Sequence, residues 1–390
     1  MQPIITTLLD TDLYKFTMQQ AILKNFPSAV VDMKFKCRSG EKLGHLYDDL
    51  MDQLDMLCKL RITDEEIEYL SGYDFFEEWY LEYLRAFQLN RDSIWVRRTE
   101  DDDLEITTHG VWALTTHFEI FVLAIVQELY SRKCGDKNWG ESFNRVIDKA
   151  NQAKAFANDL RFTITDFGTR RRYSKDWHNR VVGYLANNLP RDVFVGTSNV
   201  ALAMEYGITA SGTMAHEWLQ LGQAVFPLEE SQKGMLQTWC DTYRGKLGIA
   251  LSDVVGFDAF LRDFDGYFAR LYDGCRHDSG DPYVWTDKLI AHYEKLGIDP
   301  RTKKAIYSDG LDFIKAFQLA SRYRGQIQTS FGIGTNLTND IVDHKPLQIV
   351  MKMVKANGKP VAKISDSSGK GMCEDADYLA YLKKVFQIGE

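Results

Sequence analysis

From residue 161 to residue 354 the chain repeats one pattern: a short apolar segment, a few small or polar residues, and an amphipathic segment. Short apolar segments that alternate with helical segments are typical of parallel strands joined by crossover helices. The eight strand candidates are residues 161–168, 192–198, 207–212, 248–254, 269–275, 304–310, 327–334 and 347–354. Eight alternations of strand and helix predict an α/β barrel of parallel strands.

The residues before this repeat follow a different pattern, which indicates a second domain. An acidic amphipathic segment at 63–87 alternates with strand-like pieces such as 31–39, and two helical stretches between 111 and 159 lead into the barrel. A chain of 390 residues also exceeds the usual size of a single core. We therefore expect an N-terminal α/β domain over residues 1–120 and a catalytic barrel over residues 121–345.

Charge and apolar content exclude several classes of partner. With 47 Lys and Arg against 55 Asp and Glu, the net charge of −8 disfavours binding to nucleic acid. Six cysteines without a C-x-x-C pair are typical of reduced thiols rather than of disulfides or a zinc site. The longest apolar run, residues 120–126, is far shorter than the ~20 residues that span a bilayer. The sequence predicts a soluble cytoplasmic protein with no membrane partner.

Small, polar or charged residues follow the first seven strand candidates. The C-terminal ends of barrel strands open on one face, so clusters that are remote in sequence should surround a single site. Any one cluster also fits ordinary turn and helix-cap chemistry, and only their common position makes them a candidate site. The clusters are residues 166–172, 196–199, 211–217, 252–254, 276–281, 308–310 and 331–336.

Glycines and arginines in these clusters favour an anionic ligand. The last cluster lacks the third glycine of the dinucleotide fingerprint, but Gly310, Gly332 and Gly334 allow backbone N–H groups to approach a phosphate closely. Arg170 and Arg276 supply forked donors that suit carboxylate or phosphate. The run of arginines that begins at Arg170 is equally typical of a solvated face.

His216 lies in the third cluster, and three roles are open for it. Metal ligation is disfavoured, because a zincin helix would need a histidine where Gln220 stands. A histidine buried in the core is an ordinary alternative. A nucleophile or acid/base role is favoured by the small residues around it and by Glu217 and Asp253, either of which could fix its tautomer.

The motifs together resemble those of the nicotinate phosphoribosyltransferase family over essentially the whole chain. They are TDLYKFTM, DFGTRRR, GTSN, GTMAHEW, CRHDSGDP, YSDGLD and FGIGTNL, in the order and spacing of that family. Its members make nicotinate mononucleotide from nicotinate and phosphoribosyl pyrophosphate, with ATP hydrolysis coupled through a phosphorylated histidine. The resemblance places His216 at that histidine and Asp253 at its supporting aspartate, and it implies Mg²⁺ as cofactor and ATP as co-substrate.

The resemblance also assigns the remaining site residues. It implies that Asp278 meets the ribose hydroxyls or the metal. The 5′-phosphate would lie against Asp309, Gly310, Gly332 and Gly334, and the basic residues near the base and phosphates would be Arg170 and Arg276.

By the same resemblance, the pyridine ring lies between Phe167 and Tyr14, beside Thr169. Tyr14 would come from a second subunit, so the resemblance implies a homodimer with shared active sites. Ser198 stands where the nicotinamide-using relative has aspartate, and a serine donor favours the acid over the amide.

The fold implied by the resemblance is that of the type II phosphoribosyltransferases, an N-terminal α/β domain packed on an irregular barrel. In that fold, residues 346–390 return to the N-terminal domain. Two alternatives stay open from the residues: a quinolinate phosphoribosyltransferase, which needs neither ATP nor the histidine, and a non-catalytic protein that binds a phosphorylated sugar.

Overall fold

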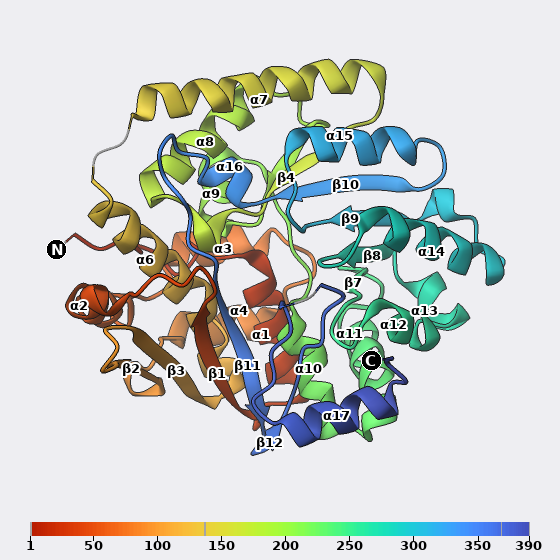
Figure 1. Ribbon diagram of the computed structural model, residues 1–390, viewed down its shortest axis with the longest axis horizontal. Helices are drawn as coiled ribbons and strands as arrows, with labels where there is room; N and C mark the ends of the chain where they lie inside the picture. Colours follow the sequence, from red (N-terminus) through yellow and green to blue (C-terminus); the bar gives the residue numbers. More distant parts are fainter. Residues whose placement is uncertain (1, 136–137, 368, 390) are drawn as a thin grey trace.

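Two β-sheets organise the chain (Figure 1), and the computed structural model describes residues 2–135, 138–367 and 369–389. One sheet has seven strands in the order β6-β5-β4-β10-β9-β8-β7, and the other has five in the order β12-β11-β1-β3-β2. The fold is therefore a mixed α/β architecture with a curled parallel half-barrel and a separate antiparallel sheet.

The parallel sheet contains a strand near each of the first seven predicted places, but the fifth is shifted. Residues 269–271 end the helix α13 (Gly266–Leu271), and the strand runs over Gly274–His277 instead. All neighbouring strands of this sheet pair in parallel, as expected for strands joined by crossover helices. Their bounds are β4 (Ile164–Asp166), β5 (Phe194–Thr197), β6 (Thr209–Ala210), β7 (Ile249–Leu251), β8 (Gly274–His277), β9 (Lys304–Tyr307) and β10 (Gln328–Ile333).

The eighth predicted barrel strand belongs to the other sheet, so the prediction of eight barrel strands is wrong. It forms β11 (Ile349–Ala356), which pairs antiparallel with β1 (Val30–Cys37) and places Lys352 opposite Lys34. A short apolar run shows a buried strand but not the sheet to which it belongs. β2 (Ile94–Arg98), β3 (Leu104–Val111) and β12 (Lys359–Pro360) complete this sheet.

Helices connect the strands and cover both sheets (Figure 1). The acidic segment at 63–87 forms two of them, and Thr63 begins the first through a capping box with Glu66. The helices are α1 (Leu13–Asn25), α2 (Tyr47–Leu57), α3 (Asp64–Ser71), α4 (Glu78–Ala86), α5 (Trp112–Thr115), α6 (Phe118–Lys133), α7 (Trp139–Asp159), α8 (Lys175–Asn188), α9 (Val200–Tyr206), α10 (His216–Val225), α11 (Ser231–Tyr243), α12 (Phe257–Asp263), α13 (Gly266–Leu271), α14 (Pro282–Lys295), α15 (Phe313–Arg322), α16 (Thr335–Thr338) and α17 (Ala376–Val385).

The helical stretch Trp112–Lys133 is central to the core. By length and composition it could cross a membrane, but 94% of its apolar window is buried within the structure. It packs against α2, against β11 and against the turn Thr169–Arg171 after β4. This stretch is therefore a core helix that joins the two sheets.

After β12 the chain returns to the barrel. The backbone N–H of Ile364 donates to Val254 O at 2.7 Å, and the N–H of Gly280 donates to Ser367 Oγ at 2.9 Å. This return brings residues 363–367 to the ends of β7 and β8. The domain boundaries near residues 120 and 345 stay predictions.

Candidate active site

A cavity of about 470 Å³ lies where the barrel strands end and β11 faces them. Its lining includes ten of the residues predicted from the sequence, and these come from segments up to 320 positions apart. They are Tyr14, Phe167, Arg170, Ser198, His216, Arg276, Asp278, Asp309, Gly310 and Gly334. The strand-end clusters therefore meet at one site.

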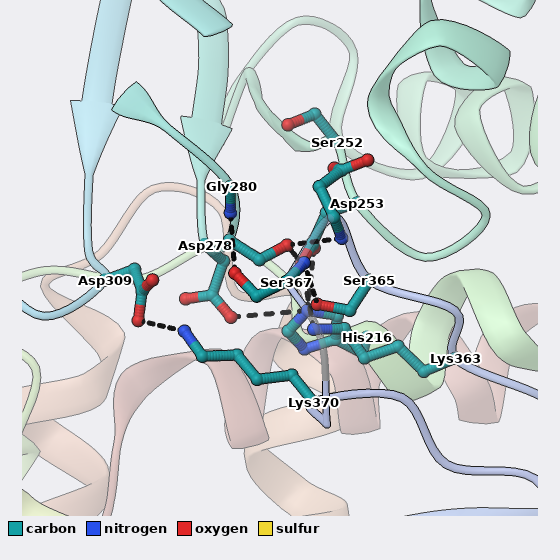
Figure 2. Close-up of polar contacts among 12 residues, drawn as sticks. His216, Ser252, Asp253, Asp278, Gly280, Asp309, Lys363, Ser365, Ser367 and Lys370 are labelled. Atoms are coloured by element: carbon teal, nitrogen blue, oxygen red, sulfur yellow. Dashed lines mark hydrogen bonds and ion pairs between the residues drawn. The ribbon is translucent and has the colours of Figure 1, made fainter. Parts of the chain in front are cut away.

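His216 lies at the first position of α10, with its ring against two carboxylates. Nε2 lies 2.9 Å from Asp253 Oδ1 and 3.3 Å from Asp278 Oδ2 (Figure 2). Burial and the nearby Lys363 ammonium lower the pKa of His216 to about 4. The imidazole is therefore neutral at physiological pH, although it lines the cavity.

Asp253 holds that imidazole in one tautomer. Its Oδ1 faces His216, and its Oδ2 accepts from Ser279 Oγ at 2.6 Å and lies 2.9 Å from Lys363 Nζ. Burial raises the pKa of Asp253, but His216 and Lys363 outweigh it and hold the pKa well below its ordinary value. An ionised Asp253 can only accept, so the proton of His216 sits on Nε2 and Nδ1 carries a lone pair.

Glu217, the other carboxylate proposed to fix this tautomer, has a different role. It pairs with the fully buried Lys15, which also lies 2.7 Å from Glu119 Oε2. Trp112 Nε1 donates to Glu217 Oε2 at 3.0 Å. This buried network ties α1 to α10 within one chain.

Tyr14 precedes Lys15 and lines the cavity of its own chain. The start of α1 is fixed there by a hydrogen bond from Leu13 N to Ser198 O at 2.8 Å, and Thr17 Oγ1 donates to Thr213 O at 2.7 Å. The single chain therefore brings Tyr14 to its own cavity, and donation of this residue by a second subunit is untested. The homodimer itself stays a prediction.

Ser198 lines the cavity, but its hydroxyl is already engaged. Its Oγ donates to Asp12 Oδ1 at 2.7 Å, and Asp12 also lines the cavity. Burial raises the pKa of Asp12, and the bond from Ser198 opposes that rise. The acceptor for the Ser198 proton is thus the neighbouring carboxylate of Asp12, a contact that no local sequence pattern indicates.

Three of the four residues expected to hold the 5′-phosphate, Asp309, Gly310 and Gly334, line the cavity. Gly310 has φ +56°, a left-handed conformation that favours glycine, and it lines the cavity beside Asp309. Gly332 does not line the cavity, because it provides space for Phe167: a Cβ at Gly332 would lie 2.1 Å from Phe167 Cδ2. Thr169 is also absent from the lining and is fully buried.

Three lysines at the site were missed from the sequence. Lys352 of β11 and Lys363 and Lys370 of the returning segment all line the cavity, and Lys370 pairs with Asp309 (Figure 2). Burial lowers the pKa of Lys352 to about 8. A lysine between two methionines in the otherwise apolar run 349–354 is the signal that could have identified Lys352.

Comparison with known proteins gives one consistent family. Residues 162–390 match the Nicotinate phosphoribosyltransferase (NAPRTase) family, and residues 9–127 match the N-terminal domain of that family. The chain is 51% identical to a nicotinate phosphoribosyltransferase of Acinetobacter baumannii, over 100% of this chain and 99% of the relative. It is 48% identical to the enzyme of that name from Bordetella pertussis, over 99% of this chain and 96% of the relative.

Solved structures agree with the sequence relatives. A crystal structure of nicotinate phosphoribosyltransferase from Vibrio cholerae superposes with a TM-score of 0.95 at 38% identity, covering 99% of this chain and 95% of that chain. The structure from Porphyromonas gingivalis gives a TM-score of 0.94 at 32% identity, covering 99% and 100% of the two chains.

Proposed function

Because the chain belongs to the nicotinate phosphoribosyltransferase family, we propose that it couples nicotinate phosphoribosyl transfer to ATP hydrolysis through phosphorylation of His216. The observation that carries this proposal is the bond from His216 Nε2 to Asp253 in the wall of the cavity. It supplies a neutral imidazole with a defined nucleophilic nitrogen.

In the proposed coupling step, Nδ1 of His216 attacks the terminal phosphate of ATP. The new N–P bond forms as the P–O bond to ADP breaks, and Asp253 stabilises the cationic ring that results. The phosphoramidate is later hydrolysed, which returns inorganic phosphate and the neutral histidine. The N-terminal end of α10 favours the negative charge that this residue then carries.

The carboxylate oxygens at this site suit Mg²⁺ better as ligands than the ring nitrogen of His216 does. Ligand atoms of His216, Asp253 and Asp278 lie within 4.8 Å of one another, and of the two carboxylates only Asp278 lines the cavity. Mg²⁺ prefers oxygen ligands, so Asp278 would hold it together with substrate phosphates. When bound, it would neutralise charge on the phosphates.

In the proposed transfer step, nicotinate displaces pyrophosphate at the anomeric carbon. Phe167 and Tyr14 would stack on the pyridine ring, and Arg170 would meet its carboxylate. Asp278 would meet the ribose hydroxyls and stabilise the oxocarbenium-like transition state. Arg276 and the backbone at Gly310 would hold phosphates.

Coupled assays test this function directly. We expect wild-type protein to make nicotinate mononucleotide from the two substrates, and to hydrolyse ATP faster when nicotinate is present. His216→Ala should lose ATP hydrolysis but keep some ATP-independent synthesis, because the substrate contacts remain. ATP hydrolysis that survives in this variant would contradict the role of His216.

The product class places the enzyme in the biosynthesis of NAD from a preformed pyridine, and we propose a salvage role in the cytoplasm. A quinolinate-using enzyme would release carbon dioxide and ignore ATP, and a binding protein would form no product. The same product assay, run with each pyridine, separates these alternatives.

A further inference from the structure

A buried carboxylate, Asp166, lies directly behind the proposed pyridine subsite and does not line the cavity. It is the last residue of β4, and both it and its partner His178 are fully buried. The proposed chemistry uses neither residue. Their contacts nevertheless lead to the two strand ends that carry Phe167 and Ser198.

Asp166 accepts three hydrogen bonds with its carboxylate. Oδ1 accepts from Gly168 N at 2.9 Å, and Oδ2 accepts from Thr197 Oγ1 at 2.6 Å. His178 Nε2, from α8, lies 2.6 Å from the same Oδ2. One side chain therefore ties the turn after β4 to the end of β5 and to a helix outside the barrel.

The main chain strengthens the same connection. Asp166 O accepts from Ser198 N at 2.8 Å, and Phe167 N donates to Ile333 O at 2.9 Å. Phe167 and Ser198 each follow a residue of this network and line the cavity. Burial raises the pKa of Asp166, but His178 outweighs it and the net pKa is lowered.

We infer that Asp166, Thr197 and His178 form a positioning network that sets the spacing of Phe167 and Ser198 and so determines the affinity for the pyridine substrate. The residues act through the cavity wall, so none of them is a catalytic residue. The inference rests on the proposed binding of nicotinate at Phe167. Displacement of a binding wall by a fraction of an ångström is enough to change affinity or rate by an order of magnitude.

Thr197→Val tests the network with a nearly isosteric change. We expect the KM for nicotinate to rise about tenfold, while the KM for phosphoribosyl pyrophosphate stays within about twofold of wild type. Thr197→Ser, which keeps the hydroxyl, should restore the nicotinate KM. Thr242→Val is the matched control. Its buried hydroxyl, like that of Thr197, donates one hydrogen bond and accepts another, but it lies in α11 and bonds to Thr238 O and Asn25 Nδ2.

His178 provides a second test that does not depend on the Thr197 variant folding. His178→Leu removes the donor to Asp166 and should raise the nicotinate KM selectively, whereas His178→Gln keeps an N–H group and should restore much of it. Each variant is measured beside its Tm. Equal changes in both KM values, or a lower Tm with unchanged kinetics, would show a purely structural pair and overturn the inference. A wild-type protein that makes no product would instead refute the proposed function.

Discussion

Asp253→Asn should abolish phosphorylation of His216 while leaving the substrate cavity in place. The amide can keep its oxygen toward Lys363 and Ser279, and its NH₂ group then faces His216 Nε2. A donor at that position requires an acceptor, so the imidazole proton moves to Nδ1. The nitrogen that should attack ATP then has no lone pair.

Loss of the correct tautomer costs about 10³- to 10⁴-fold in the enzymes where it has been isolated, or roughly 4 to 5.5 kcal/mol in the barrier. Lys363, which has 4% of its side chain exposed, also loses its counter-charge, and breaking a buried pair costs about 3 to 5 kcal/mol of folding stability. We therefore expect a lower Tm as well as a loss of phosphoenzyme.

The assay is rapid quenching with γ-labelled ATP at a temperature well below the Tm of the variant. Synthesis of nicotinate mononucleotide without ATP should fall by less than about threefold, because Asp253 does not line the cavity. Ser279→Ala is the control, since Ser279 contacts Asp253 but not His216. A folded Asp253→Asn protein that is phosphorylated within about threefold of the wild-type rate would refute this account of the tautomer.

Three further predictions follow from the cavity. Burial places the pKa of Lys352 at about 8, so the positive charge of Lys352 is present below that pH and is lost above it. We expect kcat/KM for phosphoribosyl pyrophosphate to fall about tenfold between pH 7 and pH 9 as this charge is lost. The Lys352→Arg variant, which stays charged, should not show that fall. Tyr14 and His216 line the cavity of one chain, so mixing the Tyr14→Ala and His216→Ala proteins should restore no ATP-coupled synthesis. Recovery of that coupled synthesis after subunit exchange would contradict this assignment. Ser198→Asp would place a second carboxylate against Asp12. It should lower kcat/KM for nicotinate about ten- to a hundredfold without a matching gain for nicotinamide. An unchanged ratio of the kcat/KM values for the two bases would contradict this interpretation of the pocket.

Most of the barrel strands and the ring of residues at their ends could be predicted because each signal is local. A short apolar run followed by small and polar residues identifies both the strand and the end that faces the site. The family motifs then assigned a role to His216, and Asp253 lies in hydrogen-bond contact with it. Local sequence patterns therefore predicted most of the residues of the candidate site.

The remaining features depend on contacts between distant segments. The partner sheet of β11 is set by its pairing with β1, over 300 residues away, and no local pattern reports that partner. Tyr14 reaches its own cavity because Lys15 pairs with Glu217, 202 positions along the chain. Lys363 and Lys370 come from a returning segment without a strand-end pattern, so only the folded chain brings them to the site.

The most direct test of the central claim is to locate the phosphate after incubation with γ-labelled ATP and Mg²⁺. The account predicts one acid-labile phosphate per chain, carried by the peptide that contains His216, and its loss in His216→Ala. Addition of nicotinate and phosphoribosyl pyrophosphate should discharge it as nicotinate mononucleotide forms. Product formation that depends on ATP, with the label on another residue or on none, would contradict the claim.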